Sequence, residues 1–286
     1  MNENHNAPQE FNEAPKKKSA AVMIGIICII AGIVLLITGI IVFCAIDRDK
    51  HFRTKDYTKS FSSNDIDKLE LNISCAELKI FKSEDDMIHI DAKNVHESFT
   101  AEVNGSTLST KEKKGKIFGI SLPIVNTGNN DPYIEISLPE KDYKSFHLDL
   151  GAGKTDVSGI DCGDFIVDCG AGKVTFTDVR CNTADIDCGA GDFTLDDINC
   201  EGLLDIDGGT GKIRVNGVLG GIDVDQGVGD FCFTGTMNGD IDADGGVGKM
   251  EFRLTNPSSD FKKNGGKYAM DIDTGIGSAN VIYDQE

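Results

Sequence analysis

Aspartate recurs along the second half of the chain at a fixed place beside glycine. In each case it stands two residues before the first glycine of a Gly-X-Gly triplet. Carboxylate oxygens are hard ligands that suit calcium, and carboxylates repeated on one face of a stack can share ions between neighbours. The sequence therefore predicts a candidate ladder for divalent cations, with calcium as the ion, formed by Asp168, Asp187, Asp207, Asp225 and Asp244.

A second interpretation of the aspartates is a solvated acidic surface. The pattern lacks the twelve-residue loop with a terminal glutamate that holds calcium in EF-hands, and it lacks the nine-residue period of calcium-binding β-helix repeats. Lysines in a nearby column would neutralise part of the charge; they are Lys154, Lys173, Lys212 and Lys249. The residues alone leave both interpretations open, and they indicate no organic cofactor.

Two signals of enzymatic chemistry fail on inspection. Paired acids are typical of glycosidases, but the rungs from Gly151 to Gly246 vary by only one residue in length, so no long loops wall a cleft there, and the chain has no Trp to stack on sugar. The string GAGKT at 151–155 resembles a phosphate-binding loop, yet Leu148 stands where that motif requires glycine. We predict no catalytic residues and no enzyme.

The glycine triplets define a repeat. Their first glycines are spaced by 19, 19, 20, 18, 19 and 29 residues, at Gly151, Gly170, Gly189, Gly209, Gly227, Gly246 and Gly275. Apolar residues recur three places before and six places after each of these glycines, with polar residues between, which indicates strand, turn and strand. One such rung cannot bury its own apolar face, whereas rungs stacked at roughly 4.8 Å can. We predict an all-β parallel β-solenoid, or β-helix, of regular rungs over 147–286, with a loop inserted at 254–269.

Upstream of the regular repeat, 64–146 shows the same alternation without the glycines. A solenoid end exposes unpaired backbone, so a diverged segment is expected to cover it. We predict that 64–146 forms degenerate opening rungs and a cap.

Cysteines follow the repeat in two columns. One column holds Cys162, Cys181 and Cys200, and the other holds Cys169 and Cys188. Both columns fall where the pattern predicts small inward residues, which favours buried free thiols. Disulfides between neighbouring rungs are allowed by the spacing, and no Cys-X-X-Cys pattern suggests zinc.

The N-terminal part predicts a membrane anchor. Residues 19–46 contain no charged side chain, and this length of apolar sequence spans a bilayer as an uncleaved helix. We predict a cytoplasmic tail at 1–18, the transmembrane helix at 19–46 and a linker at 47–63. Basic residues flank both sides, so charge does not fix the orientation. Small residues seven apart on one helix face would permit a homodimer through Gly25, Gly32 and Gly39.

Net charge excludes one class of partner. The chain carries a formal charge of -19 at pH 7. A polyanion would repel such a surface, so we predict no nucleic-acid binding.

The segment IEISLPEKDYKSFHLDLGAGKTDVSG and the Gly-X-Gly rungs carry a family likeness. Over 64–283 the chain resembles an adhesin-type family of bacterial β-strand-repeat domains of unknown function, related to toast-rack domains. The resemblance implies a membrane-anchored extracytoplasmic β-solenoid that serves adhesion or envelope-stress signalling, with no catalytic residues to carry over.

These observations predict a non-catalytic cell-surface interaction module of the adhesin type. It would sit in the cell membrane as a single-pass protein with its C-terminal domain outside, and its partner would be an unknown protein or envelope component. The alternative is a regulator of the envelope-stress response that acts on membrane partners. A carbohydrate-active β-helix is the third hypothesis.

Overall fold

The computed structural model describes residues 53–112, 115–117, 120–122, 131–262 and 265–285. The predicted tail, the predicted helix at 19–46 and the glycine face of Gly25, Gly32 and Gly39 lie outside these residues. Within them, no helix has the length and apolar character needed to cross a membrane. The unit described below is Phe52–Glu286.

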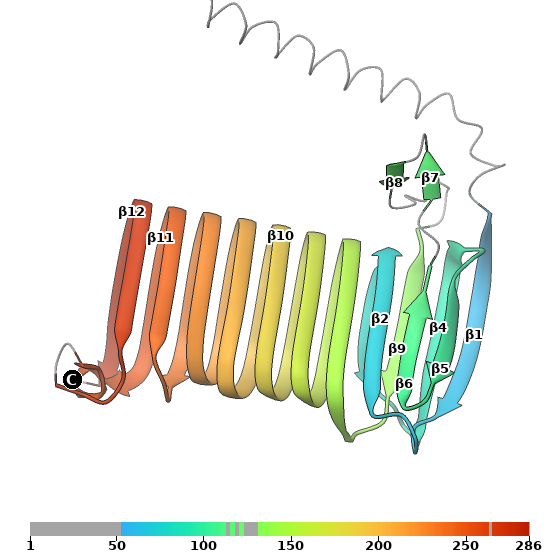
Figure 1. Ribbon diagram of the computed structural model, residues 1–286, viewed down its shortest axis with the longest axis horizontal. Helices are drawn as coiled ribbons and strands as arrows, with labels where there is room; N and C mark the ends of the chain where they lie inside the picture. Colours follow the sequence, from blue (N-terminus) through green and yellow to red (C-terminus); the bar gives the residue numbers. More distant parts are fainter. Residues whose placement is uncertain (1–52, 113–114, 118–119, 123–130, 263–264, 286) are drawn as a thin grey trace, which may run out of the picture. The chain divides into compact units, whose positions relative to one another are not determined.

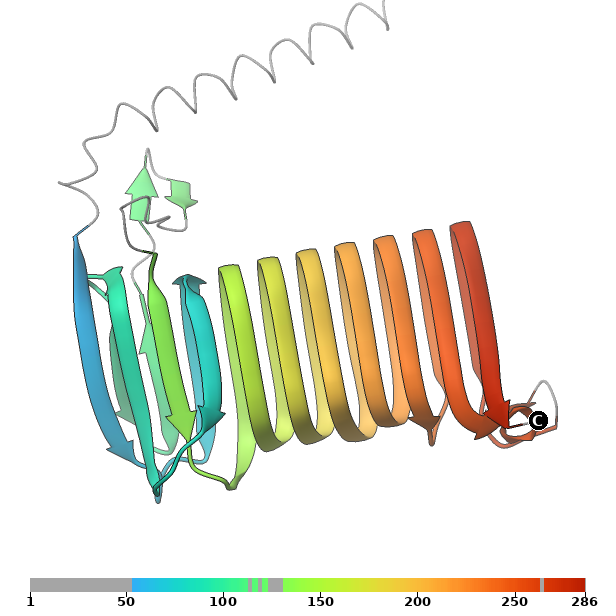
Figure 2. The same ribbon diagram turned by 180° about the vertical axis from the view of Figure 1, so that it is seen from behind.

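A stack of parallel rungs makes up most of this unit. Strand β10 (Asp142–Met237) winds through successive rungs and is followed by β11 (Ile241–Pro257) and β12 (Met270–Gln285) (Figure 1). Ile222 pairs in parallel with Ile241, and Ile241 pairs in parallel with Met270. These pairings have offsets of 19 and 29 residues and confirm the predicted parallel stacking. The view from behind shows the rungs in sequence order (Figure 2).

The extra residues of the last interval form an insertion that begins later than predicted, because residues 254–257 still belong to β11. It leaves the stack after Pro257 and contains one 3-10 turn, η1 (Ser258–Asp260). Phe261 is buried there, and its ring contacts Tyr268 and Tyr283 at centroid distances of 6.2 and 6.0 Å. The insertion therefore packs its aromatic side chains against the last rung.

The core is a set of stacked apolar columns between the two arms of each rung. Side chains three places before the glycine are buried from Leu148 to Ala243, and those six places after it are buried from Val157 to Phe252. Burying one such side chain contributes about 1.5–3 kcal/mol. In β12 the corresponding Ile272 and Val281 are only partly buried, because no further rung covers them within the described chain.

The opening segment contains true rungs. Strands β2 (Lys68–Cys75) and β3 (Glu77–Lys82) pair in parallel with the two arms of the first rung of β10. Strands β6 (Thr107–Lys111) and β9 (Tyr133–Leu138) continue this parallel order on β2 and β3. The prediction of opening rungs is therefore correct for these four strands.

The outermost strands differ from the prediction, because they run antiparallel. Strand β5 (Thr100–Asn104) forms a hairpin with β6, and β4 (Met87–His96) pairs antiparallel with β9. The β5–β6 connection is a two-residue turn at Gly105 and Ser106, and so short a connection can join only antiparallel strands. Strands β7 (Gly115–Ile117) and β8 (Ile120–Leu122) form a separate two-stranded sheet.

The predicted linker at 47–63 is wrong over its second half. Residues 54–62 form strand β1 (Thr54–Ser62), which pairs antiparallel with β4. The Tyr57 hydroxyl accepts a hydrogen bond from the Ala101 N–H at 3.1 Å and donates to the Ala101 carbonyl at 3.3 Å. Its ring packs edge-to-face on Phe99 at 5.4 Å. A side chain of β1 thus joins the two sheet edges at this end of the stack.

Candidate functional site

The glycine triplets bring successive rungs closer than any other residue would allow. A Cβ atom on Gly189 would lie 2.3 Å from the carbonyl oxygen of Gly170. The second glycine of the same triplet, Gly191, has φ of +131°, and a Cβ there would lie 1.9 Å from the Gly172 oxygen. The first position is therefore closed to side chains by contact, and the second by both contact and backbone conformation.

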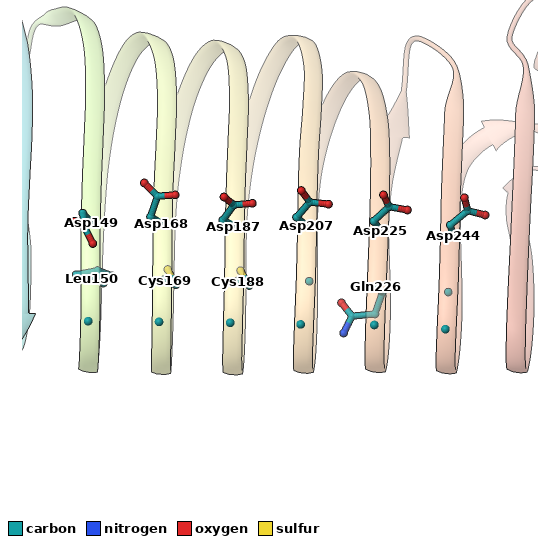
Figure 3. Close-up of a pocket in the computed structure, with 18 residues that line it drawn as sticks. Asp149, Leu150, Asp168, Cys169, Asp187, Cys188, Asp207, Asp225, Gln226 and Asp244 are labelled. Carbon is teal, nitrogen blue, oxygen red and sulfur yellow. The ribbon is translucent and has the colours of Figure 1, made fainter. Parts of the chain in front are cut away.

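Beside these turns runs an open groove with a volume of about 1030 Å³. Glycine backbone forms much of its floor, and six aspartates line it, one from each successive rung (Figure 3). The five residues of the predicted ladder lie together here, and Asp149 extends the row by one rung. As the alternation predicts, these side chains face solvent; Asp168 is half-buried and the other four ladder residues are exposed.

Cationic neighbours of the ladder are scarce in the described chain. His147 Nε2 lies 3.0 Å from Asp168 Oδ2, and within the described chain no Lys or Arg side chain pairs with any of the five ladder carboxylates. The lysines of the nearby column form no direct ion pair with the ladder in the described chain, so the partial neutralisation predicted from them would have to act over a longer distance. Lys154, for example, pairs with Asp156 at 2.5 Å and with Glu77 at 3.8 Å, because it lies beyond the turn on the other arm.

Desolvation and mutual repulsion raise the pKa values of two ladder carboxyls, Asp187 and Asp244. Partial desolvation and the charges of Asp168 and Asp207 raise the pKa of Asp187 above its usual value. The pKa of Asp244 is raised by desolvation and then by Asp225 and Asp242. A second column, four places before the glycine, adds to this charge.

In that second column, desolvation is again the largest cause of the shifts. It raises the pKa of Asp205, together with the charge of Asp223, and it raises the pKa of Asp223, together with the charge of Asp242. The two columns act as one negatively charged wall.

The two columns of carboxylates do not form a metal-coordination site in the part of the chain that the structure describes. Among the residues that the structure describes, no three His, Cys, Asp or Glu side chains come together closely enough to hold a metal ion. Carboxylates in a row along an open groove suit a loosely held cation or an extended cationic chain better than a coordinated ion.

One cluster outside the groove has the composition of a catalytic triad. Ser60 Oγ lies 2.7 Å from His89 Nδ1, and His89 Nε2 lies 2.9 Å from Asp85 Oδ1. The Asp85 carboxylate also accepts the Met87 N–H at 2.9 Å and the Ser83 hydroxyl at 3.1 Å, so it caps the bend before β4. Ser60 and Asp85 are exposed and His89 is half-exposed. We interpret the cluster as a solvated hydrogen-bond chain, because a triad acts beside an oxyanion site that excludes water.

Two sets of residues at the site were not predicted from the sequence. The residue between aspartate and glycine, such as Leu150 or Gln226, also lines the groove, and its place in the repeat could have shown this. The middle residue of the triplet changes from alanine in early rungs to an exposed apolar residue later, at Val228, Val247 and Ile276. This apolar ridge follows the turns and was readable from the aligned repeats.

Residues 66–262 match the Toastrack DUF4097 family. The chain belongs to that family. This confirms the resemblance to the adhesin-type, toast-rack-related domains, and it agrees with the solenoid-like stack of β-strands. No curated protein matches the chain.

Solved structures similar to this Toastrack chain are distant in sequence. A candidate adhesin of Bacteroides fragilis is 14% identical, with 81% of this chain and 98% of that chain covered and a TM-score of 0.43. A candidate cell adhesion protein of Clostridium sporogenes is 16% identical, with 81% and 100% covered and a TM-score of 0.36. A candidate lipid-binding protein of Parabacteroides distasonis is 12% identical, with 81% and 98% covered and a TM-score of 0.39.

Proposed function

We propose that this Toastrack protein is a non-catalytic interaction module of the cell surface. Residues 19–46 anchor it in the membrane as a single helix, and the solenoid is extracytoplasmic. The observation that supports binding is the groove, in which a row of carboxylates from six rungs meets a glycine floor and no Lys or Arg of the described chain pairs with the five ladder carboxylates.

The groove sets the chemistry of the partner. Two unit charges at the rung spacing repel by about 1 kcal/mol in water. A cationic ligand that neutralises them therefore removes an electrostatic repulsion that destabilises the free protein. The groove is long and open, which suits an extended envelope component with positive charges along it. Such binding depends on ionic strength, because the screening length for exposed charges is about 10 Å in 0.1 M salt.

The floor of the groove explains why this role is binding. Glycines at the first triplet position contribute no side chains, so few groups are available to orient a small substrate. A carbohydrate-cleaving site would need two carboxylates across a scissile bond with a wall to hold the sugar. Carboxylates that lie side by side in one row instead repeat a single interaction.

Binding of the full-length protein to envelope preparations of the producing organism tests the groove. The ladder variant carries Asn at the five positions Asp168, Asp187, Asp207, Asp225 and Asp244. The control variant removes the same number of charges from exposed acids away from the groove: Asp65, Glu84, Glu97, Asp142 and Glu201. We expect the ladder variant to bind about tenfold more weakly or worse, and the control to bind as the native chain does.

Equal losses in the two variants would contradict a groove-specific site and leave only a general charge effect. The proposed location has a separate test. A tag placed after Glu286 should be removed by protease added to intact cells, and protection of the tag until the cells are broken would contradict an extracytoplasmic solenoid.

A further inference from the structure

Two cysteines on adjacent rungs face each other beneath the groove. Cys169 and Cys188 occupy the same place in consecutive repeats, and their sulfur atoms lie at the same height on neighbouring rungs (Figure 3). The glycines that follow them are stacked, since a Cβ on Gly189 would lie 2.3 Å from the Gly170 oxygen. Both cysteines also line the groove and the small cavity below it.

The backbone geometry at this pair allows a disulfide. Paired residues on neighbouring strands have Cα atoms about 4.8 Å apart, within the range of about 4.4–6.8 Å found in disulfides. Each cysteine precedes a glycine, which can absorb a small change of backbone angle. A cavity of about 20 Å³ lies below the turns, lined by Cys169, Cys188 and Gln226 among others, and gives the sulfur atoms room to rotate.

The other cysteine column has the same spacing but a different environment. Cys162, Cys181 and Cys200 are 8%, 4% and 1% exposed, whereas Cys169 and Cys188 are half-buried and line the open groove. The Cys200 thiol donates to the carbonyl oxygens of Leu203 and Asn182 at 3.5 and 3.7 Å. A dissolved oxidant can therefore approach the groove pair, while the buried column is shielded.

We propose that Cys169 and Cys188 are a disulfide-forming pair that fastens two neighbouring rungs of the solenoid together. One thiol loses its proton, and its thiolate attacks a sulfur of an external small-molecule disulfide, which releases one thiolate of that molecule. The second cysteine loses its proton and attacks the mixed disulfide, which forms the Cys169–Cys188 bond and releases the other thiolate. Two electrons pass from the protein to the external disulfide, and the two released thiolates take up the two protons.

The surroundings of the pair set its behaviour. The neighbouring Cys188 side chain, burial and the charges of Asp168 and Asp149 raise the pKa of the Cys169 thiol. The thiolate is therefore scarce near neutral pH, and oxidation is slow. A disulfide suits an oxidising compartment, although the chemistry itself does not depend on the proposed function.

Fastening these rungs should stabilise the stack. A solenoid is held by contacts between neighbouring repeats, and the bond closes a loop of about one repeat. We expect oxidation to raise the melting temperature by roughly 5–10 °C.

Oxidised glutathione added to the reduced full-length protein tests the pair. Protease digestion without reductant, followed by mass spectrometry, should recover one peptide pair joined through Cys169 and Cys188. Cys169→Ser and Cys188→Ser should each abolish the rise in melting temperature on oxidation, while Cys232→Ser, a half-buried cysteine outside the groove lining, should keep it.

The mapping on the native chain decides the matter even if a serine variant fails to fold. A bond between Cys181 and Cys200 formed in its place would overturn the proposal. So would a stable glutathione adduct on either groove cysteine, or thiols that all stay reduced.

Discussion

At the scale of single residues, the glycine triplets determine how closely two rungs approach. Gly170 and Gly189 leave no room for a Cβ because a carbonyl oxygen of the preceding rung fills that space. Sequence periodicity located these glycines, and alternation predicted an outward direction for the aspartates. The periodicity could not show whether a turn requires glycine for its positive φ or because the neighbouring rung leaves no space for a Cβ, since glycine appears in the sequence in both cases.

Substitution of Gly189 should destabilise the fold far more than loss of a ladder charge. We expect Gly189→Val to lower the free energy of unfolding by about 3 kcal/mol or more, because a branched side chain would force two rungs apart. Asp168→Asn should change it little. Chemical denaturation of each variant measures both values.

Gly159→Ala serves as the control for backbone strain alone. Gly159 has φ of +71°, and a Cβ there meets nothing within 4 Å. Its substitution should have an effect between the other two, of about 1 kcal/mol. If Gly189→Val were no worse than Gly159→Ala, close stacking of the turns would not be the reason for the triplet.

The raised pKa values of Asp187 and Asp223 predict how stability depends on pH. Their folded-state pKa values exceed the ordinary value of 3.8, so the folded chain holds these protons more tightly than the unfolded chain. Their contribution therefore falls as pH rises from 3.8 through the folded pKa, and the loss is complete above it.

The double variant Asp187→Asn with Asp223→Asn isolates this effect from carboxyls with lowered pKa, such as Asp67 beside Lys144. Its melting temperature should exceed that of the native chain at neutral pH, and the two should converge below the ordinary aspartate pKa. A difference that stays constant across this range would show that the two carboxyls titrate alike in the folded and unfolded chains.

At the scale of elements, the two ends of the stack are different. At one end, β1 places Tyr57 and Lys59 toward β5, and both side chains reach the Ala101 carbonyl. At the other end, β12 presents Ile276 at 75% exposure. Lysines and a bulge on an edge strand oppose pairing with another chain, and β1 has both.

Tyr57→Phe should weaken the closed end. The ring contact with Phe99 would persist, but the Ala101 N–H would lose its partner, at a cost of about 1–3 kcal/mol in the free energy of unfolding. Thr58→Ala removes an exposed hydrogen bond to Asp91 from the same strand and should have little effect. Equal stabilities in urea for the two variants would show that Tyr57 does not close the stack.

The regular rungs could be predicted because every one repeats the same inward and outward positions. The antiparallel strands of the opening segment could not be predicted in this way, because their direction depends on the lengths of the connections between them and not on a repeated pattern of residues. Strand β1 was missed since its apolar residues, Tyr57 and Phe61, are separated by three polar residues and look like part of a polar linker. The groove was half-predicted: its aspartates were identified, but its floor required three-dimensional placement.

At the scale of the whole molecule, the excess of acidic groups makes the stack sensitive to ions. The formal charge is -19, and the ladder concentrates part of it on one face. Its melting temperature at neutral pH should rise with sodium chloride, because salt screens the repulsion between rungs. Since no three carboxylates converge in the described chain, calcium at matched ionic strength should produce an equal rise.

A further rise that is specific to calcium would instead favour the cation ladder. In that case Asp187→Asn combined with Asp207→Asn should remove the additional part and leave the effect of ionic strength. The comparison needs only thermal melts of the full-length protein.

The most direct test of the account is carboxyl footprinting of the full-length protein with and without envelope preparations of the producing organism. A carbodiimide and an amine label exposed carboxyls, and mass spectrometry measures the labelling of each one. Binding should protect Asp187, Asp207 and Asp225 together, while Glu84 and Glu201 on other surfaces are labelled as before. Protection confined to acids outside the groove, or none at all, would contradict the groove as the surface that meets the partner.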